Sequence, residues 1–285
     1  MIALLRTEFV KAAYRTRTLI IAAILVGLPT LIVFAIKTRG NRPGDGPGRG
    51  NGEGLFRLAQ QSGLLVPAAV LNVMSGFLLV IIAGLLAADA VAGDAASGNL
   101  RYVLMRPVRR VKLLAAKATV AGLLIWACVL VAALAALAVG VIAFGSHPLT
   151  VPGVRALAGT PLAGGFQLGA STILFRVAVG TAYVAFGFTA LLALGTFFST
   201  LTDTPTGAIG ATVGVYIVSE ILDAITQLGV VRYAFPTHYA DAWQSMFTQN
   251  QYPHDMVVGI IVQLGYLVVF GTAAAVWFRR KDIRS

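Results

Sequence analysis

The chain has 285 residues, of which 58% are hydrophobic and only 12% are charged, and its mean hydropathy is +0.83. A soluble domain carries about a quarter charged residues, so this composition excludes a water-exposed globular protein. The formal net charge is +11, but the Lys and Arg residues cluster beside apolar runs, as in membrane proteins, which argues against a nucleic-acid partner. Cys128 is the only cysteine, which excludes an intrachain disulfide and a cysteine metal cluster.

The N-terminal segment, residues 1–17, combines apolar and basic side chains at helical spacing. Ile2, Leu5 and Phe9 would share one face, and Arg6 and Lys11 supply charge. This pattern predicts an amphipathic helix in the membrane interface; an ordinary basic lead-in to a membrane helix is the alternative. The following apolar run is longer than the core of a signal peptide and has no cleavage-site pattern, so we expect it to be retained.

Six apolar stretches are long enough for membrane helices, which need about 20 mainly apolar residues. They predict an all-α integral membrane protein with a single transmembrane domain over residues 1–285. The stretches are Leu19–Ile36, Leu64–Ala88, Ala118–Phe144, Val177–Leu201, Gly207–Gly229 and Met256–Phe278.

The distribution of Lys and Arg predicts the orientation. Most of them lie in the N-terminal segment, in the loop between the second and third spans and in the C-terminal tail. Six spans put these three regions on one side, so the positive-inside rule predicts that both termini are cytoplasmic. The glycine-rich stretch Arg39–Gly54 is also basic and would lie outside, against the trend.

The loop over residues 89–117 has the most specific pattern in the chain. Small residues and the acids Asp89 and Asp94 come first, and an apolar stripe interleaved with cations follows Gly98. Pro107 is tolerated best in the first turn of a helix, so we expect a helix that begins near it and continues into the third span. A short helix with cations and an apolar ridge is typical of docking into a groove on a partner. Plain positive-inside anchoring is the alternative.

This loop resembles the cytoplasmic loop of ATP-binding-cassette (ABC) type-2 permeases. Aspartate and asparagine stand at Asp94 and Asn99, where the family usually has glutamate and threonine. An outer segment and the closing tail are also similar to those of the family. The matching positions are Asp94, Gly98-Asn99, Leu100, Arg106-Pro107, Arg110, Leu113-Leu114 and Lys117 in the loop, Pro236-Thr237-His238-Tyr239 with Trp243, and Phe278–Ile283.

The resemblance implies the permease subunit of an exporter in a bacterial plasma membrane, which works with separate ABC ATPase subunits, a second permease copy or a sister permease, and membrane lipid. It also implies a coupling site that transmits ATPase motion. The chain has no G-x-x-x-x-G-K-[ST] motif, so we expect no cofactor and no ATPase activity here, with ATP and Mg²⁺ bound by the partner. The coupling residues would be Asp94, Gly98, Arg106, Pro107, Arg109, Arg110 and Lys117.

Two acids, Glu220 and Asp223, fall inside the fifth predicted span and share one helix face. A charge near the middle of a membrane costs at least about 2.5–3.5 kcal/mol, so these acids should face protein, water or a partner. Arg176 could complete a polar cluster with them. A structural ion pair, acids beside a polar outer cavity, and a proton or ion relay all fit this pattern.

These observations leave two rival functions beside the ABC permease. A relay at Glu220 and Asp223 would belong to an ion-coupled secondary transporter, and a membrane scaffold would move nothing. His147, His238 and His254 show no paired metal-ligand spacing, and no nucleophile motif is present, so we expect no catalytic or metal site in this chain.

Overall fold

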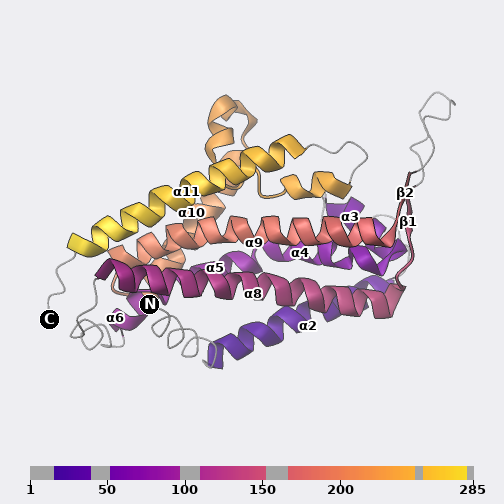
Figure 1. Ribbon diagram of the computed structural model, residues 1–285, viewed down its shortest axis with the longest axis horizontal. Helices are drawn as coiled ribbons and strands as arrows, with labels where there is room; N and C mark the ends of the chain where they lie inside the picture. The colour runs from indigo at the N-terminus through magenta and orange to yellow at the C-terminus, as the bar shows by residue number, and fades with distance from the viewer. Residues whose placement is uncertain (1–15, 40–51, 97–109, 152–165, 248–252, 281–285) are drawn as a thin grey trace.

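The computed structural model describes residues 16–39, 52–96, 110–151, 166–247 and 253–280, so the predicted interfacial helix over 1–17 lies almost wholly outside them. The protein is a bundle of long helices that run along its longest axis (Figure 1). In chain order the elements are α2 (Thr16–Arg39), α3 (Gly52–Gln61), η1 (Gly63–Leu65), α4 (Val66–Gly76), α5 (Leu78–Ala88), α6 (Ala92–Ala96), α8 (Arg110–Phe144), β1 (Leu149–Val151), β2 (Phe166–Leu168), α9 (Ala170–Leu201), α10 (Pro205–Ala224), η2 (Thr226–Ala234), η3 (Ala242–Phe247) and α11 (Pro253–Arg280).

Five of these helices, α2, α8, α9, α10 and α11, are long and apolar enough to cross a membrane. The second predicted span is a pair of helices, α4 and α5, bent by 58° where Phe77 has a non-helical backbone. Gly63, before α4, lies against Gly140 near one end of α8, while Asp94, beyond α5, contacts Lys117 near the other end. The bent pair therefore traverses the bundle and forms the sixth span, which confirms the predicted helical membrane fold.

Two regions differ from the sequence expectations. A short antiparallel ribbon of β1 and β2 joins α8 to α9, with Leu149 opposite Leu168, at the end of the bundle away from α6 (Figure 1). The fifth span was expected to continue to Gly229, but α10 ends at Ala224 because Ile225 is extended. Gly229 has a φ of +54°, a left-handed conformation that favours glycine and interrupts the following 3-10 helix.

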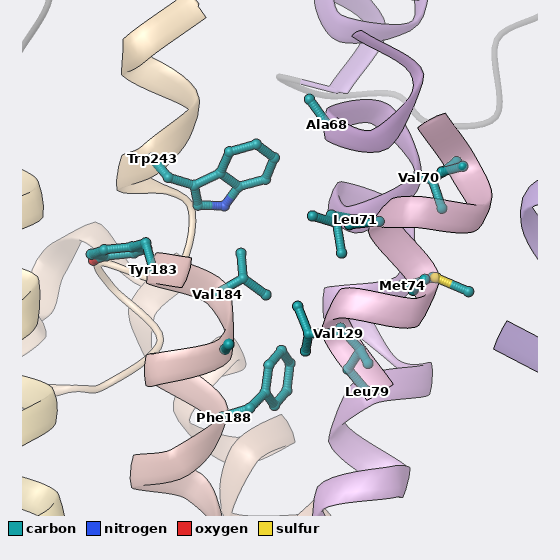
Figure 2. Packing of buried hydrophobic residues seen from close by; sticks show 14 of the residues in the cluster. Ala68, Val70, Leu71, Met74, Leu79, Val129, Tyr183, Val184, Phe188 and Trp243 are labelled. Carbon is teal, nitrogen blue, oxygen red and sulfur yellow. The ribbon is translucent and has the colours of Figure 1, made fainter. Parts of the chain in front are cut away.

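Helix α9 forms the centre of the bundle. In its most apolar segment 67% of the residues are buried, against 17–28% in the other four long helices. Val184 and Phe188 of α9 point toward Leu71 of α4 and Val129 of α8 (Figure 2). The hydroxyls of Thr181, Thr189 and Thr196 donate to carbonyls four residues earlier in α9, so these three hydroxyls are satisfied within the helix.

Glycines allow two close approaches of the backbone. At the end of the bundle that carries β1 and β2, a Cβ atom on Gly140 would lie 2.5 Å from the Gly63 carbonyl oxygen and 2.6 Å from Val66 Cβ. The Gly63 amide donates to the Gly145 carbonyl at 3.0 Å, which fastens η1 to the end of α8. At the other end, a Cβ atom on Gly195 would lie 2.6 Å from Ala87 Cβ, so α9 and α5 also meet closely.

Replacing Gly140 with alanine should destabilise the protein. The new methyl group would overlap the Gly63 backbone, and overpacking of this kind costs about 1–3 kcal/mol. Gly122→Ala on the same helix is the control, because nothing lies within 4 Å of its Cβ position. We expect a lower unfolding temperature for Gly140→Ala in detergent-solubilised protein, measured by size-exclusion chromatography after heating. Equal unfolding temperatures for the two variants would contradict the packing described here.

Candidate functional site

The end of the bundle that carries α6 holds a group of polar contacts, which we call the anchor cluster: Arg17, Asp89, Asp94, Lys117 and Ser199. These residues come from four parts of the chain, namely α2, the α5–α6 segment, α8 and α9. In the sequence, Asp94 comes shortly before residues 97–109, which connect α6 to α8, and Lys117 comes shortly after them. Gly98, Arg106, Pro107 and Arg109 of the predicted coupling site fall in that connection and lie outside the described residues.

The central contact of the cluster is an ion pair between Asp94 and Lys117. Lys117 Nζ lies 2.5 Å from Asp94 Oδ2, and the exposed fractions of the two side chains are 6% and 2%. A buried charge is tolerated only when it is paired and hydrogen-bonded. The pair therefore fixes α6 onto α8 about two turns after α8 begins at Arg110, a half-buried residue.

Ser199 of α9 closes the turn between α5 and α6. Its hydroxyl oxygen accepts hydrogen bonds from the amides of Val91 at 3.1 Å and Ala92 at 2.9 Å, and its proton is donated to the Ala88 carbonyl at 3.0 Å. These backbone groups lie at helix ends, where no partner within the helix is available. One buried side chain thus ties the segment before α6 to the central helix.

Arg17 of α2 forms an ion pair with Asp89, in which Nη1 lies 2.9 Å from Oδ1 and 3.0 Å from Oδ2. This pair is more exposed than the Asp94 pair, since half of the Arg17 side chain is accessible. A small apolar cluster joins the same segment to α8 and α11, and the partly buried Phe197 of α9 packs against it. Its buried members are Ala90, Val91, Leu114, Ala274 and Phe278.

The structure thus brings together two of the predicted coupling residues, Asp94 and Lys117, inside the chain rather than on its surface. Sequence reasoning missed the roles of Arg17, Asp89 and Ser199. Asp89 offered a signal, because an acid directly after an apolar run needs a partner. Ser199 offered none, because one serine in an apolar helix shows no pattern.

Breaking the Asp94–Lys117 pair should destabilise the fold. Asp94→Ala or Lys117→Met each leaves a buried charge without its partner, which costs about 3–5 kcal/mol. The double variant removes both charges and should recover much of the loss. Lys37→Met is the control, because Lys37 is an exposed lysine on α2. The measurement is the unfolding temperature of the purified protein.

Additive losses in the double variant, or unfolding temperatures of the single variants equal to that of Lys37→Met, would contradict a stabilising pair. This test does not depend on any transported substrate.

The other predicted polar cluster is arranged differently from expectation. Asp223 lies 2.6 Å from His238 Nδ1 and 3.5 Å from Arg232 Nε, so its partners come from the segment after α10. Arg176 donates a hydrogen bond of 2.5 Å to the Met246 carbonyl, and among the described residues it forms no ion pair with Asp223 or Glu220. The sequence could not foresee this arrangement because it depends on the turn at Gly229.

The segment after α10 packs as a cap over α9 and α11. His238 lies edge-on between the rings of Tyr233 and Tyr239, and the Tyr183 hydroxyl of α9 donates to the Tyr239 carbonyl at 2.6 Å. Burial raises the pKa of the Tyr239 phenol above its ordinary value, and the nearby carboxylate of Asp255 raises it further. Trp243 is fully buried; in Figure 2 it points toward the core, and a Cβ on Gly180 would lie 2.9 Å from its ring.

A cavity lies beneath this cap and is partly open; the space between its walls, including the open side, is about 660 Å³. Side chains of α9, α10 and α11 form its walls, and most of them are apolar. Its polar members include Tyr183, Ser219 and Gln263. Gln263 is 3% exposed, and its Oε1 atom is buried without a hydrogen-bond partner among the described residues. The cavity can therefore hold an apolar group with one hydrogen-bond donor.

Among the described residues, no group of three or more His, Cys, Asp and Glu side chains is placed to hold a metal ion. A six-span helical bundle with buried anchors beside a basic connecting loop defines a multi-pass membrane protein. The sequence model of one family, described as ABC-2 family transporter protein, matches residues 2–283. The chain belongs to this family, and it is a membrane permease of the ABC transporter class. A search of the curated proteins found no match.

Members of the family are membrane subunits that lack ATPase motifs, and family membership implies an ABC ATPase subunit as partner.

Proposed function

We propose that this chain is the permease subunit of an exporter in a bacterial plasma membrane, with both termini in the cytoplasm. Two ATPase subunits, which bind ATP and Mg²⁺, dock on the connection between α6 and α8 and drive transport. The anchor cluster is the observation that carries the proposal. A loop that receives force from another protein needs rigid attachments to the spans, and Asp94–Lys117 and Ser199 provide them at its two ends.

In this mechanism, closure of the ATPase subunits moves the connection, and the buried ion pair carries that movement to α8. Ser199 carries it to α9, which packs against both helices of the bent span and against α10. A displacement at one end of α9 thus reaches the cavity beneath the cap, because Tyr183, Val184 and Phe188 of α9 line that cavity. The cavity is the part of the path that the transported molecule would contact, and its walls favour an apolar group.

A second permease copy, or a sister permease, would pack against α10. This helix presents the exposed apolar residues Ile217, Val218 and Ile221. Nothing lies within 4 Å of a Cβ atom built on Gly210 or Gly214, so this small-x-x-x-small step is open on its outer side. In membranes such steps allow two helix backbones to approach closely.

The proposal predicts that charge reversal in the connection separates ATPase binding from membrane insertion. In Arg109→Glu/Arg110→Glu, the amount of ATPase that co-purifies from membranes should fall at least about tenfold. Two charge pairs at a docking surface together contribute about 1.4 kcal/mol or more to the binding free energy, and 1.4 kcal/mol corresponds to a tenfold change in affinity. The amount of inserted permease should stay near that of the wild type. Lys37→Glu/Arg39→Glu, at the other end of α2, is the matched control and should keep the ATPase.

Leu104→Asp and Val108→Asp extend this test to the apolar stripe, which a docking helix would bury and a solvated anchor would expose. Normal co-purification and normal ATP-dependent transport in all these variants would contradict docking at this loop. Reduced insertion with a normal complex would instead favour plain positive-inside anchoring.

A further inference from the structure

A groove runs along the outside of the bundle between α8 and α11, with α9 as its floor. We call it the α8–α11 groove, and its open volume is about 1150 Å³. Small residues leave the space: nothing lies within 4 Å of a Cβ atom built on Gly122 of α8 or Gly271 of α11. Leu123 and Trp126 form the wall at its inner end.

The polar side chains in the groove have partners already. The hydroxyls of Thr119 and Thr196 donate to carbonyls of their own helices at 2.7 and 2.8 Å. The Trp126 indole N–H donates to the Thr189 hydroxyl at 3.0 Å, and that hydroxyl donates in turn to the Ala185 carbonyl. A groove without unmet donors or acceptors in its walls suits a hydrocarbon chain, which offers none.

The mouth of the groove is cationic. Arg110 and Lys112 from the start of α8 and Arg279 from the last turn of α11 line one hollow of about 1010 Å³. Val111 lines both this hollow and the groove, so the two are adjacent. Positive-inside anchoring explains cations at helix ends, but it does not require cations of two helices to line a common hollow next to an apolar groove.

The length of the groove distinguishes between occupants. From Val111 to Trp126 it follows α8 for about 22 Å, at 1.5 Å per residue. One leaflet of the hydrocarbon core is about 15 Å thick, so the groove covers one leaflet and the headgroup layer next to it. A membrane helix of another protein would need the full thickness of about 30 Å, whereas one acyl chain fits the available length.

We propose that the α8–α11 groove binds an anionic phospholipid, with its phosphate at Lys112 and Arg279 and one acyl chain along α9. Basic pockets between membrane helices recognise anionic headgroups in this way. The bound lipid would bridge α8 and α11 at the level of Leu114 and Phe278, next to the anchor cluster. Arg110 lines the hollow and also belongs to the proposed docking region, so the lipid site is tested at Lys112 and Arg279, which do not belong to that region.

Trp126 provides a reporter inside the groove. The chain has three tryptophans. Trp277 is exposed and would be replaced by phenylalanine in every variant. Trp243 is buried, and its background fluorescence is measured in a variant that also carries Trp126→Phe. The full-length protein is reconstituted into vesicles of ordinary phosphatidylcholine. Increasing mole fractions of one brominated lipid are then added, either phosphatidylglycerol or phosphatidylcholine, each with bromine in its acyl chain. Bromine quenches the indole fluorescence on contact.

We expect half-maximal quenching of Trp126 at a mole fraction at least about fivefold lower for brominated phosphatidylglycerol than for brominated phosphatidylcholine. Lys112→Gln/Arg279→Gln should remove this difference. Arg280→Gln is the matched control, because Arg280 is an exposed cation next to Arg279 that does not line the hollow. It should keep the difference.

Gly271→Leu tests the acyl-chain part of the site, because Gly271 lines the groove and nothing lies within 4 Å of a Cβ atom there. It should reduce quenching by both lipids, while Gly265→Leu, on the same helix and equally open, should not. Equal quenching by the two lipids in the wild type would overturn the proposal. So would a change of oligomeric state in Gly271→Leu without any lipid preference, because the groove would then be a protein contact.

Discussion

The buried ion pair between Asp94 and Lys117 is the interaction on which the rest of this structure depends. Two charges taken out of water are stable only while they stay together, so the pair tolerates little separation between α6 and α8. An apolar contact at the same place would let α6 slide along α8, because apolar contacts have no direction. A buried, hydrogen-bonded ion pair holds the two helices in one geometry. The basic connection between α6 and α8 therefore begins and ends at fixed points.

The second constraint is close packing around α9. Glycines at the two ends of the bundle let the bent span lie directly on its neighbours, Gly63 on Gly140 of α8 and Ala87 on Gly195 of α9. Protein interiors packed in this way transmit displacement rather than absorb it. The cavity under the cap and the α8–α11 groove are places where this packing is left open on opposite sides of α9, and movement of α9 would reshape both.

Much of the fold could be predicted from the sequence, because runs of about 20 apolar residues have few alternatives. The break at Phe77 was not predicted, although Ser75-Gly76 directly before it offered a weak signal, because such pairs are common sites of helix kinks. At the site, the acid–glycine–cation pattern identified Asp94 and Lys117 but not their pairing, because the sequence does not say which charges are buried. Asp223 was found by its position in an apolar run, yet its partners Arg232 and His238 follow a turn that no periodicity indicates.

Hydrogen–deuterium exchange on the intact complex shows whether the anchor cluster transfers ATPase motion to the spans. Exchange would be compared with and without ATP over residues 89–96 and over the first turns of α8, in the wild type and in Asp94→Ala/Lys117→Met. The double variant lacks the pair but leaves no unpaired buried charge. We expect ATP to change exchange in both segments of the wild type. The double variant should keep the response in 89–96 but lose it in α8. An identical response of α8 in the two proteins would contradict the account.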